Sequence, residues 1–349
     1  MTTPTRRRRL ASSSEGEAVV TLAMVAHAAG VSTGTVSRTL NGSPSVSEAK
    51  RQAVLEAVRH LGFRPNPVAR GLAGGRTLSV GVLTPTITSP YYGEMLGGVE
   101  QELAAQGYMP LFASARWSEA GERQALAALV GRRVDALVVL AGLLPNSVLV
   151  TYAQHLPMVV VGRAAQAPGL FCLAFDNRRG ARLATQHLID SGHRRIAHIT
   201  GNLEQEDGPL RLAGYRDALM AAGLAFDPTL VIEGNFTEDG GQRALEQMLA
   251  SRLDFTAVFA GNDQMALAAA LALHRHGRRV PDDVSLVGFD DLAPAHYAIP
   301  PLTTVHQPAY LMGRQAAVAV MDLLRGQQPQ VQLPTPELVL RESTRKLQR

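Results

Sequence analysis

The sequence contains little sulfur and few aromatic side chains: 349 residues include one cysteine and one tryptophan, and aromatic residues make up 5% of the chain. A single cysteine cannot form a disulfide within the chain, which excludes a disulfide-dependent fold and indicates a reducing compartment. Cys172 lies in an apolar run, residues 170–175, so we expect it to fill the core as part of a buried strand. No apolar run reaches the roughly 18 residues that a membrane-spanning helix needs, so we expect no membrane partner.

A signal for export is also lacking. Residues 6–9 are four arginines, but the segment that follows them, residues 11–17, is rich in serine and glutamate and is not apolar. We therefore expect a cytoplasmic protein. Residues 1–20 show no periodicity and are predicted to be a disordered basic arm. Such an arm is either a solvated tail or a segment that adds contacts to phosphates.

Motifs of several enzyme classes are missing. The sequence has no Gly-x-Gly-x-x-Gly after an expected strand, no phosphate-binding loop, no His-Glu-x-x-His and no nucleophile elbow between an expected strand and helix. The ten histidines are scattered, and His193, beside Arg194 and Arg195, is interpreted as a loop residue and not as a ligand. We therefore expect a protein that is not an enzyme, with no catalytic residues, no metal ligands and no cofactor.

Acidic residues are scarce at the N-terminal end. Residues 1–70 hold ten Lys or Arg against four Asp or Glu, whereas the remaining residues hold 24 against 26. A basic excess confined to one end indicates a polyanionic partner there, because neutralisation of phosphates drives non-specific DNA binding. The length of 349 residues, with 46% hydrophobic content, predicts two or three folded domains.

Within the basic region, residues 21–42 predict two short helices around a glycine turn. Thr21 is expected to cap the first helix, Gly30 to end it, and Ser32 to cap the second. A third helix is expected over residues 47–62. Three helices of this pattern form a helix-turn-helix, whose second helix enters a DNA groove. The alternative is an ordinary helical hairpin whose polar face is only solvated.

After residue 77, short β-branched runs alternate with amphipathic stretches, the pattern of parallel strands covered by crossover helices. The expected strands are residues 78–84, 109–113, 136–140, 158–161, 196–200, 257–260 and 284–288. The expected helices are residues 91–106, 119–130, 177–191, 210–222, 237–250, 263–276 and 310–325. Ligands of such sheets gather at the carboxyl ends of the strands, so polar residues that follow a strand are candidate ligand contacts.

Several runs carry a resemblance to a known family. Residues 25–41 are Val-Ala-x-x-Ala-Gly-Val-Ser-x-x-Thr-Val-Ser-Arg-x-Leu-Asn, and residues 61–66 are Leu-Gly-Phe-x-Pro-Asn. Further runs are Gly-His-Arg-Arg-Ile at 192–196, Arg-Leu-Ala-Gly-Tyr at 211–215, Asn-Asp-Gln-Met-Ala at 262–266, Val-Pro-Asp-Asp-Val-Ser-Leu-Val-Gly-Phe-Asp-Asp at 280–291 and Pro-Leu-Thr-Thr-Val at 301–305. Over nearly its whole length the chain resembles the lactose-repressor and galactose-repressor (LacI/GalR) family of bacterial transcription regulators.

The resemblance implies an α/β protein with a three-helix helix-turn-helix head, a hinge helix, and a two-lobed, periplasmic-binding-protein-like core of parallel sheets with flanking helices. After the basic arm, residues 1–20, the expected domains are the helix-turn-helix domain at 21–64, the hinge at 65–76 and the effector-binding and dimerisation domain at 77–349. The alternative for the hinge is a plain interdomain linker.

The second helix is the expected DNA-reading element. Arg38 can donate two hydrogen bonds to guanine, and Thr33 and Thr35 can reach phosphates or a thymine methyl group. Gly34 departs from the family, which usually carries a base-reading side chain there. In the family, a leucine matching Leu72 wedges into a base step while the hinge folds on operator DNA. The candidate DNA-binding residues are Thr21, Ser32, Thr33, Gly34, Thr35, Ser37, Arg38, Asn41, Asn66, Ala69, Arg70 and Leu72.

The resemblance also implies an effector cleft between the two lobes. Carboxylate, amide and guanidinium groups are what a hydroxyl-rich ligand needs, because each buried hydroxyl must find a partner. We therefore expect a sugar or sugar acid as effector. Each candidate also has a structural alternative, such as a helix cap or a surface ion pair. The candidate effector-binding residues are Tyr91, Tyr92, Arg163, Phe175, Arg211, Phe236, Asn262 and Asp290.

These features predict a ligand-responsive repressor of a carbohydrate-utilisation operon that binds palindromic double-stranded operator DNA as a homodimer. Residues 337–349 lack leucine heptads, so the tetramer-forming helix of some relatives is not expected. One alternative is a family member that responds to a purine or another metabolite. Another is a solute-binding protein, which the basic head and the missing export signal oppose.

Overall fold

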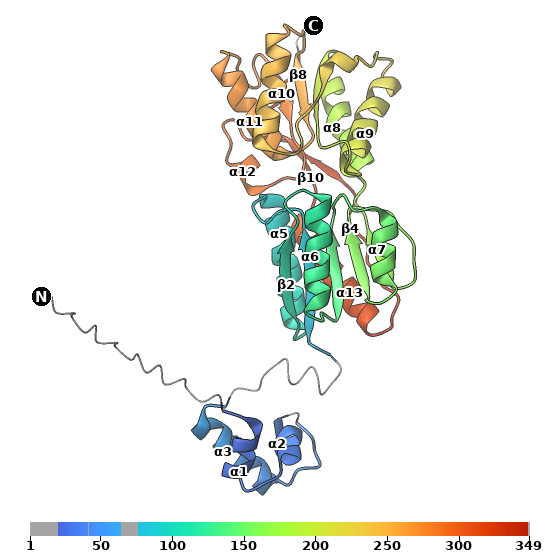
Figure 1. Cartoon of the computed structure of the whole chain (residues 1–349). Coiled ribbons are helices and arrows are strands. Elements are labelled where there is room, and N and C mark those ends of the chain that lie inside the picture. Colours follow the sequence, from blue (N-terminus) through green and yellow to red (C-terminus); the bar gives the residue numbers. More distant parts are fainter. Residues whose placement is uncertain (1–19, 41, 64–75, 348–349) are drawn as a thin grey trace, which may run out of the picture. The chain divides into compact units, whose positions relative to one another are not determined.

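The computed structural model describes residues 20–40, 42–63 and 76–347. The chain divides into two compact units, Met1–Thr77 and Leu78–Arg349. In the smaller unit the described residues form α1 (Leu22–Ala28), α2 (Thr33–Leu40) and α3 (Glu48–Leu61), and the larger unit is an α/β structure (Figure 1).

The turn between α1 and α2 forms as the sequence predicts. The Thr21 hydroxyl accepts a hydrogen bond from the backbone N–H of Met24 over 3.4 Å, which caps α1. Gly30 has a φ of +62° and ends this helix in the left-handed region. The Ser32 hydroxyl accepts from the backbone N–H of Thr35 over 3.2 Å and caps α2. The predicted roles of all three residues in the turn are confirmed.

The three helices of the smaller unit enclose a small core. Val25 of α1, Val36 of α2 and Val54 of α3 are each fully buried, and Leu40 packs on them while partly exposed. The third helix ends at Gly62, whose φ is +61°. Because the apolar side of α2 faces this core, Thr33 and Arg38 are left exposed, whereas Thr39 is buried with Val36.

The larger unit begins with a parallel five-stranded sheet in the order β2-β1-β3-β4-β5. Its strands are β1 (Ser79–Thr84), β2 (Met109–Ser114), β3 (Ala136–Leu140), β4 (Met158–Val161) and β5 (Leu170–Leu173). One face packs against α5 (Pro90–Ala105) and α13 (Ala309–Leu324), and the other against α6 (Glu119–Gly131) and α7 (Asn146–Ala153). We call this sheet with its helices the first lobe. Because both faces are covered, every residue of β3 and β4 is buried.

The second lobe is built around a parallel four-stranded sheet in the order β7-β6-β8-β9. Its strands are β6 (Ile196–Thr200), β7 (Val231–Glu233), β8 (Ala257–Ala260) and β9 (Ser285–Val287). On one face lie α8 (Asn177–Asp190) and α9 (Asp207–Ala221), and on the other α10 (Glu238–Ala250) and α11 (Asp263–Arg275). The short helices η1 (Pro228–Leu230) and α12 (Ala293–His296) lie in its connecting loops.

The chain passes between the two lobes three times, as Figure 1 shows. It crosses from β5 to α8, returns from β10 (Thr304–His306) to α13, and crosses again to β11 (Glu337–Val339), which pairs antiparallel with β10. In the first lobe α13 lies very close to α5. A Cβ at Gly98 would lie 2.1 Å from the carbonyl oxygen of Tyr310, and a Cβ at Gly313 would lie 1.9 Å from that of Met95. Glycine at both positions permits this approach of the two backbones.

Every strand and helix expected after residue 77 is present, with ends that differ by a few residues. Short elements were not expected, namely α7, β7, η1, α12, β10 and β11. The expectation for Cys172 is confirmed in part: it lies in a strand and packs against the core of the first lobe, but it is partly exposed, because β5 is the edge of its sheet and has a neighbouring strand on one side only. None of the helices within the described ranges combines the length and the apolar character needed to span a bilayer.

Candidate effector cavity and DNA-binding helix

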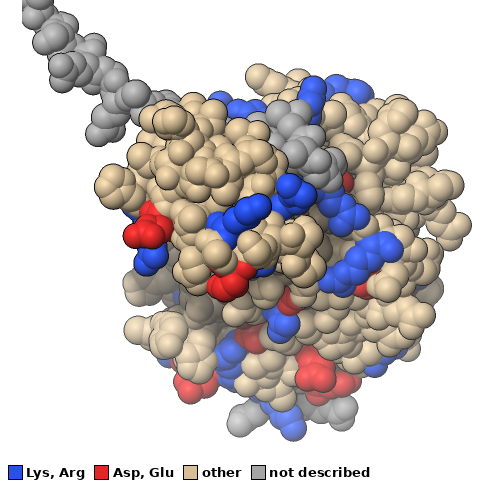
Figure 2. Space-filling view, turned by 90° about the horizontal axis from the view of Figure 1, so that it is seen from below, with Lys and Arg blue, Asp and Glu red and all other residues tan. Residues whose placement is uncertain are grey.

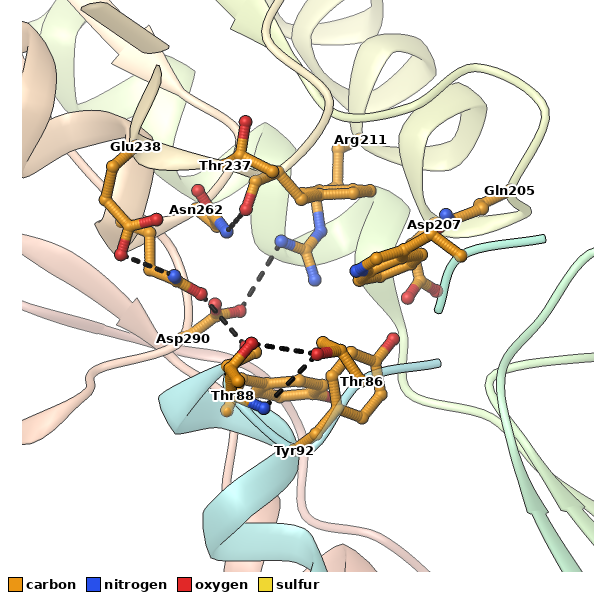
Figure 3. A pocket seen from close by; sticks show the side chains of 15 residues that line it. Thr86, Thr88, Tyr92, Gln205, Asp207, Arg211, Thr237, Glu238, Asn262 and Asp290 are labelled. Carbon is orange, nitrogen blue, oxygen red and sulfur yellow. Dashed lines mark hydrogen bonds and ion pairs between the residues drawn. The ribbon is translucent and has the colours of Figure 1, made fainter. Parts of the chain in front are cut away.

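A cavity of about 150 Å³ lies between the two lobes (Figure 3). It sits where strands of both sheets end, since Thr86 follows β1, Asn262 follows β8 and Asp290 follows β9. Its first-lobe lining is Thr86, Thr88, Ser89, Tyr91, Tyr92 and Trp117. Its second-lobe lining is Gln205, Asp207, Arg211, Phe236, Thr237, Glu238, Asn262, Gln264 and Asp290.

Arg211, on α9, has its charged group in the second-lobe wall and is only 3% exposed. Its Nε donates to Asn177 over 2.8 Å, and one terminal nitrogen donates to Gln307 over 2.8 Å. The other terminal nitrogen donates to the carbonyl of Gly261 and lies 3.5 Å from a carboxylate oxygen of Asp290. The guanidinium also lies 3.7 Å from the ring centroid of Phe289. These contacts fix its position.

Asp290 faces this guanidinium from the loop after β9. It is 4% exposed, and its φ of +112° is one that residues with a side chain rarely adopt. Its backbone N–H donates to the carbonyl of Val305 over 2.9 Å, which holds the unusual conformation in place. Burial raises the pKa of Asp290 well above its ordinary value, and the positive charge of Arg211 opposes that rise.

Asp263, at the start of α11, holds the segment that carries Asp290. One of its carboxylate oxygens accepts the backbone N–H of Leu292 over 2.8 Å, and the other accepts the hydroxyl of Thr304 over 2.6 Å. Burial raises the pKa of this carboxyl to about 7. Asp263 does not line the cavity, so its contribution to the site is to position the loop.

Two further carboxyl groups lie in the second-lobe wall, at the first residues of two helices. Asp207 begins α9 and accepts a hydrogen bond from the Asn177 amide over 2.8 Å. Burial raises the pKa of this carboxyl, and the charge of Arg211 again opposes the rise. Glu238 begins α10 and accepts from the amide of Gln264 over 2.7 Å. The wall therefore holds three carboxyl groups around one guanidinium.

Aromatic rings form most of the first-lobe wall. The rings of Tyr91 and Tyr92 meet edge to face at 5.2 Å, and Tyr92 meets Trp117 in the same manner at 5.7 Å. The Tyr91 hydroxyl accepts a hydrogen bond from the Gln307 amide nitrogen over 2.7 Å. The amide oxygen of Gln307 accepts from Arg211, so Gln307 links Tyr91 to Arg211. Burial raises the pKa of both tyrosines, so their hydroxyls stay protonated.

The structure brings six of the eight candidate effector-binding residues to the cavity wall, and these are Tyr91, Tyr92, Arg211, Phe236, Asn262 and Asp290. The amide of Asn262 already caps α11 through Met265, over 2.9 Å, and donates to the Phe236 carbonyl over 3.1 Å. The other two candidates lie elsewhere. Phe175 borders a smaller adjoining hollow, and Arg163 donates to the carbonyls of Gly142 and Leu144 within the first lobe.

Sequence reasoning did not single out several residues of the lining. Trp117 follows the end of β2, Gln205 lies in the loop before α9, and Asp207 is the first residue of α9. Thr237, Glu238 and Gln264 begin α10 and α11. The signal that could have found them is the one applied to Asn262, namely a polar or aromatic residue between a strand and the next helix.

On the DNA side, α2 presents the predicted face. Thr33, Gly34 and Arg38 are exposed, whereas Thr35 and Ser37 are partly buried. The Nε of Arg38 donates to the carbonyl of Gly34 over 3.1 Å, so the guanidinium lies along the helix surface. The candidates Asn41, Asn66, Ala69, Arg70 and Leu72 lie outside the described residues, as does nearly all of the expected hinge.

Four of the ten basic residues within the first 70 are described, namely Arg38, Lys50, Arg51 and Arg59. Arg51 is engaged internally, since it donates to the Ser43 carbonyl over 2.9 Å and lies 3.5 Å from Glu48. On the face drawn in Figure 2, Lys and Arg side chains are spread among uncharged ones and form no continuous patch. Among the described residues of the smaller unit, the exposed candidates for DNA contact on α2 are Thr33, Gly34 and Arg38.

Comparison with known proteins finds two matching family models. Residues 21–66 match the bacterial regulatory proteins of the lacI family, and residues 185–344 match the periplasmic binding protein-like domain. The first match covers all three helices of the smaller unit, and the second covers most of the second lobe and the crossings to the first.

Similar proteins extend over almost the whole chain. The transcriptional regulator GalR of Escherichia coli K12 is 40% identical over 306 residues, which cover 87% of this chain and 89% of that protein. The lac repressor dimer bound to operator and the anti-inducer ONPF superposes with a TM-score of 0.85 at 31% identity, over 93% of this chain and 99% of that one. The complex of the regulator CelR with cellobiose gives a TM-score of 0.70 at 39% identity, again over 93% and 99%. Such similarity across both units leads us to conclude that this chain belongs to the lacI family and is a DNA-binding transcription regulator.

Proposed function

We propose that the chain is a repressor of a carbohydrate-utilisation operon whose affinity for operator DNA is set by a small sugar-like effector. The observation that carries this proposal is the cavity between the lobes, in which Arg211 and Asp290 are buried opposite aromatic rings. Carboxylates, hydroxyls and aromatic faces together suit a ligand that is polar at its rim and apolar on its ring face. The similar protein CelR has been solved with cellobiose, and the lac repressor with ONPF.

In this proposal residues 1–20 are a basic arm, residues 21–64 bind DNA, residues 65–76 are the hinge, and residues 77–349 bind the effector and dimerise. Two heads of a homodimer would occupy half-sites about 34–36 Å apart, or a multiple of that distance, in a palindrome. The exposed guanidinium of Arg38 supports base reading, because it is the one charged group of α2. Leu72 remains the predicted wedge of the hinge.

For the effector side we propose contacts from the six wall residues already named and, in addition, from Trp117, Asp207 and Glu238. Phe175 supports the wall from behind, since its ring lies 6.3 Å from Phe289, which in turn contacts Arg211. Arg163 stays a prediction, and its bonds to carbonyls favour a supporting role. We further propose that the protein acts in the cytoplasm and catalyses no reaction.

The position of the cavity explains how effector binding can be coupled to DNA binding. A ligand that contacts both walls stabilises one arrangement of the lobes over another, and a head that binds DNA better in one arrangement responds to it. Such couplings are typically about 1–3 kcal/mol and act equally in both directions.

Selection of genomic fragments tests this function. The purified full chain is incubated with sheared genomic DNA and excess random competitor, with and without carbohydrates, and the retained fragments are sequenced. The proposal expects enrichment of a palindrome near carbohydrate genes and a changed yield when one sugar is present. Retention of no fragment above competitor contradicts DNA regulation, and enrichment that responds to a purine but to no sugar contradicts the effector class.

A further inference from the structure

We propose that the edge of the second lobe opposite the cavity is a further binding surface for duplex DNA, separate from the helix-turn-helix. This surface holds the phosphate backbone and reads no sequence. The proposal goes beyond effector-controlled operator binding, because its residues belong neither to the cavity lining nor to the smaller unit.

The edge is formed where the strands of the second lobe begin. The cavity lies at their carboxyl ends, so the opposite edge consists of the loops that enter β6, β8 and β9. The C-terminal segment, residues 343–347, completes it beside β9. The backbone N–H of Leu286 donates to the Ser343 carbonyl over 2.8 Å, and the Ser343 hydroxyl donates to the Leu286 carbonyl over 2.6 Å. This edge points away from the first lobe (Figure 1).

Hydrogen bonds join these loops into one surface. The backbone N–H of Thr256 donates to the Arg195 carbonyl over 3.0 Å, and that of Ser285 donates to the Thr256 carbonyl over 3.0 Å. The backbone N–H of Arg345 in turn donates to the Ser285 hydroxyl over 3.0 Å. Neighbouring strands lie about 4.8 Å apart, so the surface extends roughly 14 Å from the start of β6 to the C-terminal segment.

Basic side chains gather on this surface. Its described residues include eight Arg or Lys and five Asp, whereas residues 71–349 as a whole hold 24 Lys or Arg against 26 Asp or Glu. The five acids are Asp190, Asp227, Asp254, Asp282 and Asp283. We call the eight basic residues, all of them exposed, the basic edge: Arg194, Arg195, Arg252, Arg275, Arg278, Arg279, Arg345 and Lys346.

Most of the acids are already neutralised by two members of the basic edge. In the part of the chain that the structure describes, the other six members form no ion pair. Six cations therefore face one remaining carboxylate, and a polyanion is attracted. The pairs, at distances of 3.1–3.6 Å, are Arg195 with Asp227 and Asp254, and Arg279 with Asp282 and Asp283.

Helix ends account for part of the basic edge. Arg194 donates to the Ile189 carbonyl in the last turn of α8 over 3.1 Å, and Arg275 is the last residue of α11. Both complement the partial negative charge of a helix C-terminus. Arg278, Arg345 and Lys346 lie outside the helices, and their side chains form no hydrogen bond with any described residue. These three are therefore free to contact an external anion.

The character of the surface favours a nucleic acid over an acidic protein. Within residues 190–195, 252–256, 274–285 and 343–347, no large apolar side chain is exposed. A protein interface generally has an apolar or aromatic core, which this surface lacks. Phosphates are bound by guanidinium and ammonium groups alone. Duplex DNA carries one charge per about 1.7 Å of its axis, so a surface roughly 14 Å across faces several phosphates.

A bridging assay on the full chain tests the proposal. Operator duplex is fixed to beads in excess over the chain, so that the helix-turn-helix units are occupied, and unbound chain is washed away. A labelled duplex of random sequence is then added at increasing salt concentrations. The wild type should retain this second duplex at low salt and release it as the salt rises, because each phosphate contact releases counterions.

Neutralising the three free side chains should reduce this retention. The triple variant Arg278→Gln, Arg345→Gln and Lys346→Gln should retain about tenfold less of the second duplex at low salt. The slope of log affinity against log salt should decrease by up to about three, roughly one for each lost contact. Operator affinity, measured by anisotropy, should equal that of the wild type, because the helix-turn-helix is unchanged.

A matched control removes three charges from the larger unit away from the basic edge. Arg132→Gln, Arg179→Gln and Arg243→Gln alter exposed side chains that follow α6, begin α8 and lie within α10. This variant should retain the second duplex as the wild type does. Melting temperatures of both triple variants establish that they are folded.

Three outcomes overturn the proposal: no retention by the wild type, equal retention by the wild type and the edge variant, or an equal loss in the control. Competition then identifies the class of partner. Polyglutamate that displaces the labelled duplex at a lower charge concentration than unlabelled duplex would assign the surface to an acidic protein and would also overturn it. The genomic selection described above is a separate result, since it depends on the helix-turn-helix and the effector.

Discussion

The hydroxyl of Ser89 donates a hydrogen bond to Oε1 of Gln264 over 3.0 Å, although the two residues are 175 positions apart. Ser89 precedes α5 in the first lobe, and Gln264 lies in the first turn of α11 in the second. The same Gln264 donates from its amide to Glu238 over 2.7 Å. The lobes are thus joined directly at the cavity wall by a side-chain bond that any opening of the lobes must break.

Replacing Ser89 with alanine removes this bond. A net hydrogen bond contributes about 0.5–1.5 kcal/mol, so effector affinity should fall by about two- to tenfold if binding requires the joined arrangement. Calorimetric titration with the sugar that changes the yield of the genomic selection measures the change in affinity. Ser147→Ala, in α7 and away from the lining, is the matched control. Equal affinity of the Ser89 variant and the control would show that the bond plays no part in holding the lobes.

Arg211→Met should cost both stability and effector binding. Removing one partner of a buried ion pair leaves the other charge unpaired and costs about 3–5 kcal/mol, and both Arg211 and Asp290 are under 5% exposed. The double variant Arg211→Met with Asp290→Asn removes both charges and should recover part of the melting temperature but none of the effector binding. Thermal unfolding of the two variants and the wild type makes the comparison. A double variant less stable than the single one would contradict the pairing.

The pH dependence of stability should report Asp263. Its pKa is raised from 3.8 to about 7, so between these values the folded chain holds a proton that the unfolded chain has released. The group therefore stabilises the fold at low pH, and this contribution is lost as the pH rises through about 7.

Melting temperatures of the wild type and of Asp263→Asn at pH 5 and pH 8 test this sign. The wild type should lose more stability over that interval than the variant. Asp239→Asn, which changes an exposed carboxyl, should behave as the wild type does. An identical loss in the wild type and the Asp263 variant would exclude Asp263 as the source.

On the DNA side, Gly34→Ala should stabilise α2 by about 1 kcal/mol, because alanine is the better helix former. An added Cβ meets nothing closer than the Ser32 hydroxyl at 3.8 Å, an ordinary contact distance. Preference among base pairs should stay weak at the step that faces this position, since neither residue reads a base. Binding-site selection on both proteins measures the preference. A strong preference at every position of the wild-type half-site would contradict the role assigned to Gly34.

Arg38→Ala should weaken binding to the selected operator by about 1–3 kcal/mol and relax specificity at one position. Lys50→Ala, also exposed but on α3, provides a control that removes one charge from the same unit. Both variants should lower non-specific binding by a similar amount. Equal loss of specific binding in the two variants would mean that Arg38 contributes charge and no base contact.

Local patterns in the sequence were sufficient for the helix-turn-helix. Each of its features is local. Thr21 caps α1 and Ser32 caps α2 through a backbone N–H three residues further on, and the left-handed turn depends on Gly30 itself. The parallel strands were equally predictable, because burial on both faces requires the apolar runs seen in β3 and β4. Short strands such as β7 have too few residues to show a periodic pattern of apolar side chains, so the sequence does not predict them.

The cavity was only partly predictable, because its wall depends on packing between distant segments. Asp290 follows a strand in a well-matched run and is predicted, whereas Trp117 also follows a strand but has a backbone φ of +55°, and the strand pattern does not indicate that conformation. Arg163 also follows a strand, yet its side chain turns to the carbonyls of Gly142 and Leu144. A polar residue after a strand is therefore only a candidate for the cavity wall. The hydrogen-bond acceptors that the fold brings near it decide where its side chain points.

The most direct test of the account measures operator binding and cavity occupancy in one titration. Affinity of the full chain for its selected operator is followed by anisotropy of labelled DNA while the sugar effector is added. Emission of Trp117, which lines the cavity and is the one tryptophan of the sequence, reports occupancy in parallel. The account predicts that operator affinity changes about 5- to 150-fold over the same sugar concentrations that saturate the cavity. Operator affinity that stays constant while Trp117 reports a filled cavity would contradict it.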